Sequence, residues 1–174
     1  MRNVEIKAKI KDYKEICKLA EELSGGPPTI INQDDTFYKV NHGRLKLRVY
    51  RDKSATLVRY DREDNGEPNL CEYELLNFSK EESDKPKLLD EMLRKCCGTR
   101  GRVIKERKLF MVGQTRIHID TVKDLGHYME LEVVLDDSQS LEDGQKIAKE
   151  LQNKLQVRDE DLIHCAYVDL LDKL

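Results

Sequence analysis

The chain has 174 residues, of which 39% are hydrophobic and 37% are charged, and this charged share is well above the roughly one quarter that is usual for globular domains. The 31 basic and 34 acidic residues nearly cancel, giving a net charge of −3. This balance argues against nonspecific binding to nucleic acid or to an anionic membrane, because both need a large basic surplus. No apolar run approaches the roughly 18 residues of a membrane span. We therefore expect a single domain over residues 1–174 with no nucleic-acid or membrane partner.

The first residues enter a charged, alternating sequence at once, so we expect no signal peptide. The five cysteines are an odd number and include no C-x-x-C spacing. Both features are typical of a cytoplasmic protein whose thiols stay reduced. The sequence leaves the oligomeric state open, with a homodimer among the options.

Strict alternation of apolar and polar residues predicts β-strands over 4–10, 44–49, 116–119 and 129–134. Further strands are expected near 33–40, 54–62, 70–76 and 102–112, between turn signals such as the one at 64–66. Helical patterns cover about 12–24, 84–96, 138–154 (begun by Ser138 or Ser140) and 159–172. The predicted fold class is α+β.

The polar faces of these strands are mostly charged, and for any one strand the ordinary explanation is that this face meets solvent. Four helices must also bury apolar stripes, and the apolar strand faces are the only large partner for them. If the sheet closes and the helices pack outside it, the charged faces turn inward. We therefore expect a closed eight-stranded antiparallel β-barrel with helices on its outer surface.

Charges of the two signs are segregated on these faces. The basic positions are Arg44, Lys46, Arg48, Arg59, Lys105, Arg107 and Arg116, and the acidic ones are Asp120, Glu130 and Glu132. An interior of this kind is stable when it holds a polyanion with divalent cations, since unpaired buried charges are costly. Arginine pairs with phosphate through two hydrogen bonds, and Mg²⁺ or Mn²⁺ takes carboxylate and phosphate oxygens. The pattern indicates a metal–triphosphate site, with a solvated strand edge as the alternative for the glutamates and an ion pair with Arg116 or His118 as the alternative for Asp120.

Several segments, taken in order, resemble the CYTH family of triphosphate tunnel metalloenzymes, and more closely its class IV adenylyl cyclase-like branch, which is related to thiamine triphosphatase. They are residues 3–9 (NVEIKAK), 33–38 (QDDTFY), 43–48 (GRLKLR), 57–62 (LVRYDR), 103–107 (VIKER), 115–120 (TRIHID), 125–132 (LGHYMELE) and 166–171 (AYVDLL). The resemblance implies an enzyme with an eight-stranded tunnel that requires Mg²⁺ or Mn²⁺. Its substrate would be ATP, thiamine triphosphate or tripolyphosphate.

Carried over by position, Glu5 matches the first glutamate of the family's E-x-E-x-K signature, and Lys9 matches its lysine, which implies a catalytic role for Lys9. The implied triphosphate-binding residues are Lys7, Lys46, Arg48, Arg59, Lys105, Arg107 and Arg116. The implied metal ligands are Glu5, Glu130, Glu132, Asp120 and His118. Two positions depart from the family pattern, because Lys7 replaces the second signature glutamate and His118 stands where the phosphatases carry an acidic residue. Both changes remove a carboxylate, although a neutral histidine can still bind a metal.

The resulting hypothesis is a metal-dependent enzyme that either hydrolyses a triphosphate or cyclises ATP to cyclic AMP. The alternative is a module that binds triphosphate or polyphosphate without turnover, since Lys7 and His118 leave fewer carboxylates for a metal. Asp34 and Asp35 are interpreted as rim or turn residues rather than ligands. The tyrosines Tyr38, Tyr60 and Tyr167 are interpreted as packing or lid contacts.

Overall fold

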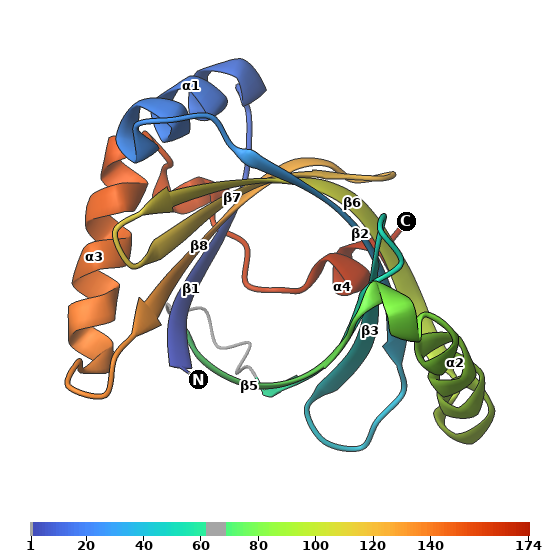
Figure 1. Cartoon of the computed structure of the whole chain (residues 1–174). Coiled ribbons are helices and arrows are strands. Elements are labelled where there is room, and N and C mark those ends of the chain that lie inside the picture. The colour runs from blue at the N-terminus through green and yellow to red at the C-terminus, as the bar shows by residue number, and fades with distance from the viewer. Residues whose placement is uncertain (1, 62–68) are drawn as a thin grey trace.

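The computed structural model describes residues 2–61 and 69–174 and contains eight antiparallel strands (Figure 1). The strands are β1 (Arg2–Lys9), β2 (Thr29–Tyr38), β3 (Arg44–Tyr50), β4 (Ala55–Asp61), β5 (Asn69–Phe78), β6 (Thr99–Val112), β7 (Thr115–Val122) and β8 (Gly126–Leu135). Each lies at or within a few residues of a predicted strand, since alternation is a direct signature of a strand with one face buried. The predicted turn at 64–66 lies outside the described residues.

The strands form one curled sheet with the order β1-β5-β4-β3-β2-β6-β7-β8. Among the residues that the structure describes, β1 pairs with β8 over eight positions, Arg2 to Lys9, and with β5 over four, Arg2 to Glu5. Beyond Glu5, the C-terminal segment also contacts β1: Ala8 bridges to Leu162, and the Ile163 amide donates to the Lys7 carbonyl at 2.8 Å. The eight antiparallel strands of the predicted barrel are confirmed, but the barrel is not fully closed as predicted.

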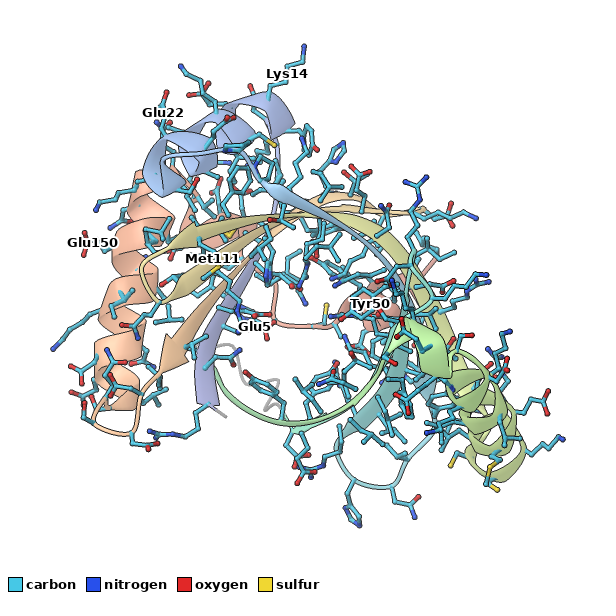
Figure 2. All side chains as sticks on the ribbon, in the orientation of Figure 1. Glu5, Lys14, Glu22, Tyr50, Met111 and Glu150 are labelled. Atoms are coloured by element: carbon cyan, nitrogen blue, oxygen red, sulfur yellow. The ribbon has the colours of Figure 1, made fainter. Side chains whose placement is uncertain are left out.

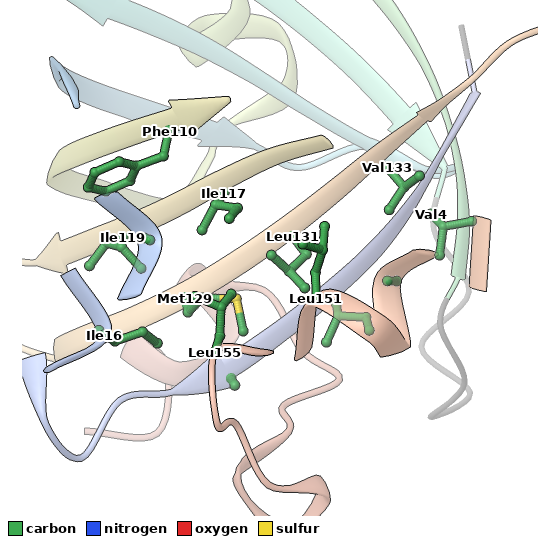
Figure 3. Close-up of a cluster of buried hydrophobic side chains, with 14 of the residues drawn as sticks. Val4, Ile16, Phe110, Ile117, Ile119, Met129, Leu131, Val133, Leu151 and Leu155 are labelled. Atoms are coloured by element: carbon green, nitrogen blue, oxygen red, sulfur yellow. The ribbon is translucent and has the colours of Figure 1, made fainter. Parts of the chain in front are cut away.

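Helices cover the apolar outer face of the sheet, as expected. They are α1 (Tyr13–Ser24), α2 (Asp84–Cys97) and α3 (Leu141–Lys154). A fourth helix, α4 (Tyr167–Leu171), lies elsewhere, and short 3-10 turns occur at Lys80–Glu82 and Asp159–Asp161. Beneath α1 and α3, the fully buried Ile117, Met129 and Leu131 form the main core with side chains from both helices (Figure 3). Each such side chain stabilises the fold by about 1.5–3 kcal/mol through burial.

Local sequence fixes where these helices begin and how closely they approach. The Asp12 carboxylate accepts from the amides of Lys14 and Glu15 at the start of α1, and Ser140 and Asp143 form a capping box at the start of α3. In α3, a Cβ on Gly144 would lie 2.6 Å from the Val4 side chain and 2.7 Å from that of Leu135. A glycine is therefore needed for α3 to lie this close to the sheet.

The predicted fourth helix at 159–172 is wrong in extent and in position. Only Tyr167–Leu171 is α-helical, and in Figure 1 this short helix lies inside the ring of strands. Its apolar residues pack on inward side chains of the barrel, with Tyr167 and Val168 buried against Phe37 and Val103. An apolar stripe looks the same in the sequence whether it packs outside the sheet or plugs its end.

Among the helices of the described chain, none combines the length and apolar character that a membrane crossing requires.

Candidate active site

The inner faces of the strands and the C-terminal segment enclose a cavity of about 300 Å³. Glu5 and Tyr50, two of its lining residues, are labelled in Figure 2. Nine of the thirteen predicted site residues line it: Glu5, Lys7, Lys46, Arg48, Lys105, Arg107, Arg116, Glu130 and Glu132. They come from β1, β3, β6, β7 and β8, so the alternation of each strand brings them to one place.

A first cluster, which we call the Asp35 clamp, consists of Asp35 on β2 with Lys46 and Arg48 on β3. The Asp35 carboxylate accepts from Lys46 Nζ at 2.9 Å and from Arg48 Nε and Nη2 at 2.7 Å each. Burial opposes ionisation of this carboxyl, but Arg48 and Lys46 outweigh it and hold its pKa far below the ordinary value. The interpretation of Asp35 as a rim or turn residue was wrong, since it is 2% exposed and directly opposite Arg48 in the β2–β3 register.

A second cluster, the Asp120 clamp, repeats this arrangement with Lys105 and Arg107 on β6 and Asp120 on β7. Asp120 accepts from Lys105 Nζ at 2.8 Å and from Arg107 Nε and Nη2 at 2.7 Å each. The hydroxyl of Tyr167 also donates to Asp120, at 3.1 Å. The ring of Tyr167 lies under the ammonium groups of Lys7 and Lys105, at 4.4 and 4.9 Å from its centroid. Tyr167 is thus more than a packing contact, because it holds both the carboxylate and the lysines.

The third group of charges is centred on Glu130 and Glu132 of β8. Lys7 Nζ lies 3.1 Å from Glu130 Oε1, and Arg107 pairs with Glu130 Oε2. Burial would raise the pKa of Glu130, but Lys7 and Arg107 hold it well below its usual range, so the carboxyl is ionised. The Nδ1 atom of His118 lies 3.8 Å from Glu130 Oε2 and 3.6 Å from Glu132 Oε1.

His118, Glu130 and Glu132 offer three donor atoms that lie within 4.8 Å of one another, which suits a single divalent ion. The other two predicted ligands are outside this group. Asp120 is bound by the lysine, arginine and tyrosine of its clamp, and Glu5 lies 3.9 Å from Lys7 Nζ on the cavity wall. Three of the five predicted ligands therefore form a compact cluster. The other two, Asp120 and Glu5, lie outside it.

Two predicted residues lie away from the cavity. Arg59 shares the outer face of β4 with Leu57, because Val58 and Tyr60 point inward; its side chain is 41% exposed and pairs with Asp61. Lys9 is exposed at the end of β1 and is not among the residues that line the cavity. The alternation of β4 misled the prediction because both of its faces carry apolar residues.

The cavity wall formed by β4 and β5 is uncharged. It consists of Thr56, Val58, Tyr60, Tyr73, Leu75 and Asn77. Thr56 Oγ1 donates to Asn77 Oδ1 at 2.9 Å within this wall, and an asparagine side chain also carries an NH₂ donor. One part of the cavity can thus hold a phosphate chain, and the adjoining wall of β4 and β5 offers apolar, aromatic and amide groups.

Comparison with known families identifies a CYTH domain over residues 1–167. The chain belongs to the CYTH domain family. A search of curated proteins found none that matches it. The CYTH match covers all eight strands and every cavity residue named above.

Solved structures share this CYTH fold at low sequence identity. The PH1012 protein of Pyrococcus horikoshii superposes with a TM-score of 0.83 at 18% identity, covering 97% of this chain and 98% of that one. A conserved hypothetical protein of Pyrococcus furiosus gives 0.80 at 19% identity, with 97% and 99% covered. A Vibrio parahaemolyticus protein described as a candidate adenylate cyclase gives 0.72 at 18% identity, with 98% and 97% covered. At such identities the likeness establishes the fold.

Proposed function

We propose that this protein is a divalent-metal-dependent enzyme that acts on a triphosphate held in the barrel cavity. The observation that supports it best is the meeting of two unlike groups at one cavity of about 300 Å³. Lysines and arginines line it together with Glu130 and Glu132, and the buried His118 completes a His–Glu–Glu cluster with these two glutamates. Basic side chains bind phosphate oxygens, and carboxylates with an imidazole bind a divalent ion. Membership of the CYTH family is consistent with both the phosphate-binding group and the metal-binding group.

Lys46 and Arg48 are the groups best placed to bind the phosphate chain first. Their side chains are 14% exposed, whereas those of Lys105 and Arg107 are 3% and 6% exposed. Arg48 offers a planar fork that suits two phosphate oxygens, and Lys46 adds a point charge. Lys7 and Arg107 border both the phosphate side and Glu130, so they would fix the end of the chain that lies nearest the carboxylates.

Glu130 and Glu132, with His118, would hold the ion. Mg²⁺ or Mn²⁺ there would supply charge neutralisation and Lewis acidity at the phosphorus under attack. The protein's own contribution is to hold the phosphate chain on Lys46 and Arg48, with its end beside Lys7 and Arg107, and to keep bulk water out with Tyr167, which closes one side of the cavity. We assign no catalytic part to Lys9, since its exposed position gives it no contact with the cavity.

Two reactions fit this arrangement, as the sequence suggested. In hydrolysis, water attacks the terminal phosphorus, the diphosphate part of the substrate leaves, and inorganic phosphate is formed. In cyclisation, the 3′-hydroxyl of ATP attacks the α-phosphorus and pyrophosphate leaves. The uncharged wall of β4 and β5 favours a substrate with an organic group, because Tyr60, Tyr73 and Val58 offer apolar contact for a base or a thiazole ring. The third possibility, binding without turnover, is motivated by the ion pair between Lys7 and Glu130, which competes with a metal.

The test is to incubate the protein with ATP, thiamine triphosphate and tripolyphosphate, each with Mg²⁺ or Mn²⁺, and to follow phosphate, pyrophosphate and cyclic nucleotide. We expect metal-dependent turnover of at least one of them. In Glu132→Gln, which keeps the size but removes the charge, turnover should fall at least about a hundredfold. Tripolyphosphate binding in the presence of a chelator should change far less, because Glu132 is not part of either clamp. Full activity of Glu132→Gln would contradict the proposal, and binding without any product would favour the non-catalytic module.

A further inference from the structure

The His118 imidazole is buried, and one of its two ring nitrogens has no hydrogen-bond partner among the described residues. This nitrogen is Nδ1, and the side chain is 5% exposed. Leaving such an atom unpaired costs about 1–3 kcal/mol, so a site that keeps it needs an explanation. The two nearest oxygens, on Glu130 and Glu132, lie 3.8 and 3.6 Å away.

These separations are too long for N–H···O hydrogen bonds, which are about 2.7–3.2 Å. They are short enough for three donors that share one ion at about 2.0–2.2 Å from each. We infer that His118, Glu130 and Glu132 form a site selective for a divalent ion of the Mn²⁺-to-Zn²⁺ series over Mg²⁺. This inference rests on the proposed function only in that it concerns the metal cluster of the same cavity.

The donor types decide the preference. Mg²⁺ is a hard ion that demands six oxygen ligands in a nearly ideal octahedron and binds imidazole weakly. Ions from Mn²⁺ to Zn²⁺ accept imidazole nitrogen, with affinities that generally increase along the series from Mn²⁺ to Co²⁺ and beyond. A third carboxylate at position 118 would suit Mg²⁺ better. The histidine therefore shifts the site toward the borderline ions.

The surrounding strands and charges hold the donors in place. His118 pairs directly with Glu130 in the β7–β8 register, and Glu132 is two residues further along the same face of β8. Lys7 holds the other oxygen of Glu130, and Arg116 Nη1 lies 3.4 Å from Glu132 Oε2. Contacts to the remaining carboxylate oxygens orient metal ligands in this way.

Arg107 opposes binding, because it pairs with Glu130 Oε2, the oxygen closest to His118. An ion at the cluster would share that oxygen with a guanidinium. Arg107 also donates two hydrogen bonds to Asp120, so it retains a carboxylate partner if it yields Glu130. The ion therefore displaces one contact of Arg107 without leaving the arginine unpaired.

The experiment is calorimetric titration of the phosphate-free protein with Mg²⁺, Mn²⁺ and Co²⁺ at neutral pH. We expect Co²⁺ and Mn²⁺ to bind at least about tenfold more tightly than Mg²⁺. In His118→Gln, Co²⁺ affinity should fall at least about tenfold, with a much smaller change for Mg²⁺. The matched control is His127→Gln, because His127 lies on the outer side, bonded to Thr121 and stacked on Tyr13, and it should leave all three affinities unchanged.

A second variant, His118→Asp, should reduce the difference in affinity between Co²⁺ and Mg²⁺, since it replaces a nitrogen ligand with an oxygen ligand. Equal affinity of the unmodified protein for Mg²⁺ and Co²⁺ would overturn the inference, as would Co²⁺ binding that survives in His118→Gln or the absence of binding by any of the ions. Turnover is measured separately. Mg²⁺-dependent turnover without Co²⁺ preference leaves the enzyme proposal intact, whereas Co²⁺ preference without turnover leaves the metal site intact and contradicts the enzyme.

Discussion

Asp35 and Asp120 each accept hydrogen bonds from a lysine and an arginine that lie two residues apart on the neighbouring strand. The distances match to within 0.1 Å, since both arginines donate twice at 2.7 Å and the lysines lie at 2.9 and 2.8 Å. The surroundings differ. The Asp35 clamp adjoins the uncharged wall of the cavity, since Lys46 and Arg48 pair with Val58 and Thr56 in the β3–β4 register, while the Asp120 clamp is contacted by Tyr167 and adjoins Glu130.

This comparison shows that a Lys-x-Arg motif does not by itself determine a phosphate site. In the Asp35 clamp, an incoming phosphate chain can approach Lys46 and Arg48 from the cavity and compete with a single carboxylate. In the Asp120 clamp, both cations already pair with Asp120, Arg107 also pairs with Glu130, and the ring of Tyr167 lies against Lys105. We infer that the first clamp binds substrate and that the second chiefly supports Glu130 and the C-terminal helix.

The largest expected effect comes from removing each clamp's carboxylate in turn. Asp120→Asn leaves two deeply buried cations short of a counter-charge, which should lower the free energy of unfolding by about 3–5 kcal/mol. Asp35→Asn should cost less, about 1–3 kcal/mol, because its cations retain some solvent. Urea denaturation of both variants measures the difference.

Tripolyphosphate sharpens that test. It should restore much of the melting temperature of Asp35→Asn, since its oxygens replace the lost carboxylate, and it should help Asp120→Asn little. If both variants lose the same free energy of unfolding and tripolyphosphate restores both melting temperatures equally, the two clamps are equally accessible to phosphate. The proposed difference between the two clamps would then be wrong.

Sequence patterns predicted the strands well and predicted the site unevenly, for identifiable reasons. β3 and β8 have one charged and one apolar face, so Lys46, Arg48, Glu130 and Glu132 were placed correctly in the cavity. β4 has apolar residues on both faces, so Arg59 could not be assigned a side. Asp35 was missed because two adjacent aspartates look like a turn, and only the β2–β3 register places one of them opposite Arg48.

An intermediate effect is expected from the charge state of Lys46. Burial and the nearby charge of Arg48 lower its pKa to about 8, although Asp35 acts in the opposite direction. Below pH 8 the free protein carries the charge that a phosphate chain needs; above pH 8 that charge is lost, and binding must take up a proton. Tripolyphosphate affinity should therefore fall about tenfold between pH 7 and pH 9.

The control for this pH dependence is Lys46→Arg, whose guanidinium stays charged throughout the range. Its affinity should follow only the ionisation of tripolyphosphate itself, so the difference between the two proteins isolates the lysine. Calorimetry in buffers of different ionisation enthalpy counts the protons taken up. If the pH profiles coincide, Lys46 does not contact the phosphate chain.

The smallest expected effect concerns the hydroxyl of Tyr167, which is the contact that distinguishes the Asp120 clamp from its counterpart. Tyr167→Phe removes one hydrogen bond to Asp120 but keeps the ring under Lys7 and Lys105, so the free energy of unfolding should fall by about 1 kcal/mol. For a chain of this length, that corresponds to a melting temperature lower by about 2–4 °C. Tyr167→Leu also removes the ring and its contacts with both ammonium groups, so the free energy of unfolding should fall further.

Hydrogen exchange tests whether Tyr167 holds the C-terminal segment in place. The amides of Ile163 and Leu170, which donate to the carbonyls of Lys7 and Ala166, should exchange faster in both variants. Amides between β3 and β4 should exchange at an unchanged rate. Unchanged exchange at Ile163 in Tyr167→Leu would show that the C-terminal segment is held on β1 by its backbone pairing alone, so that Tyr167 does not keep this segment over the Asp120 clamp.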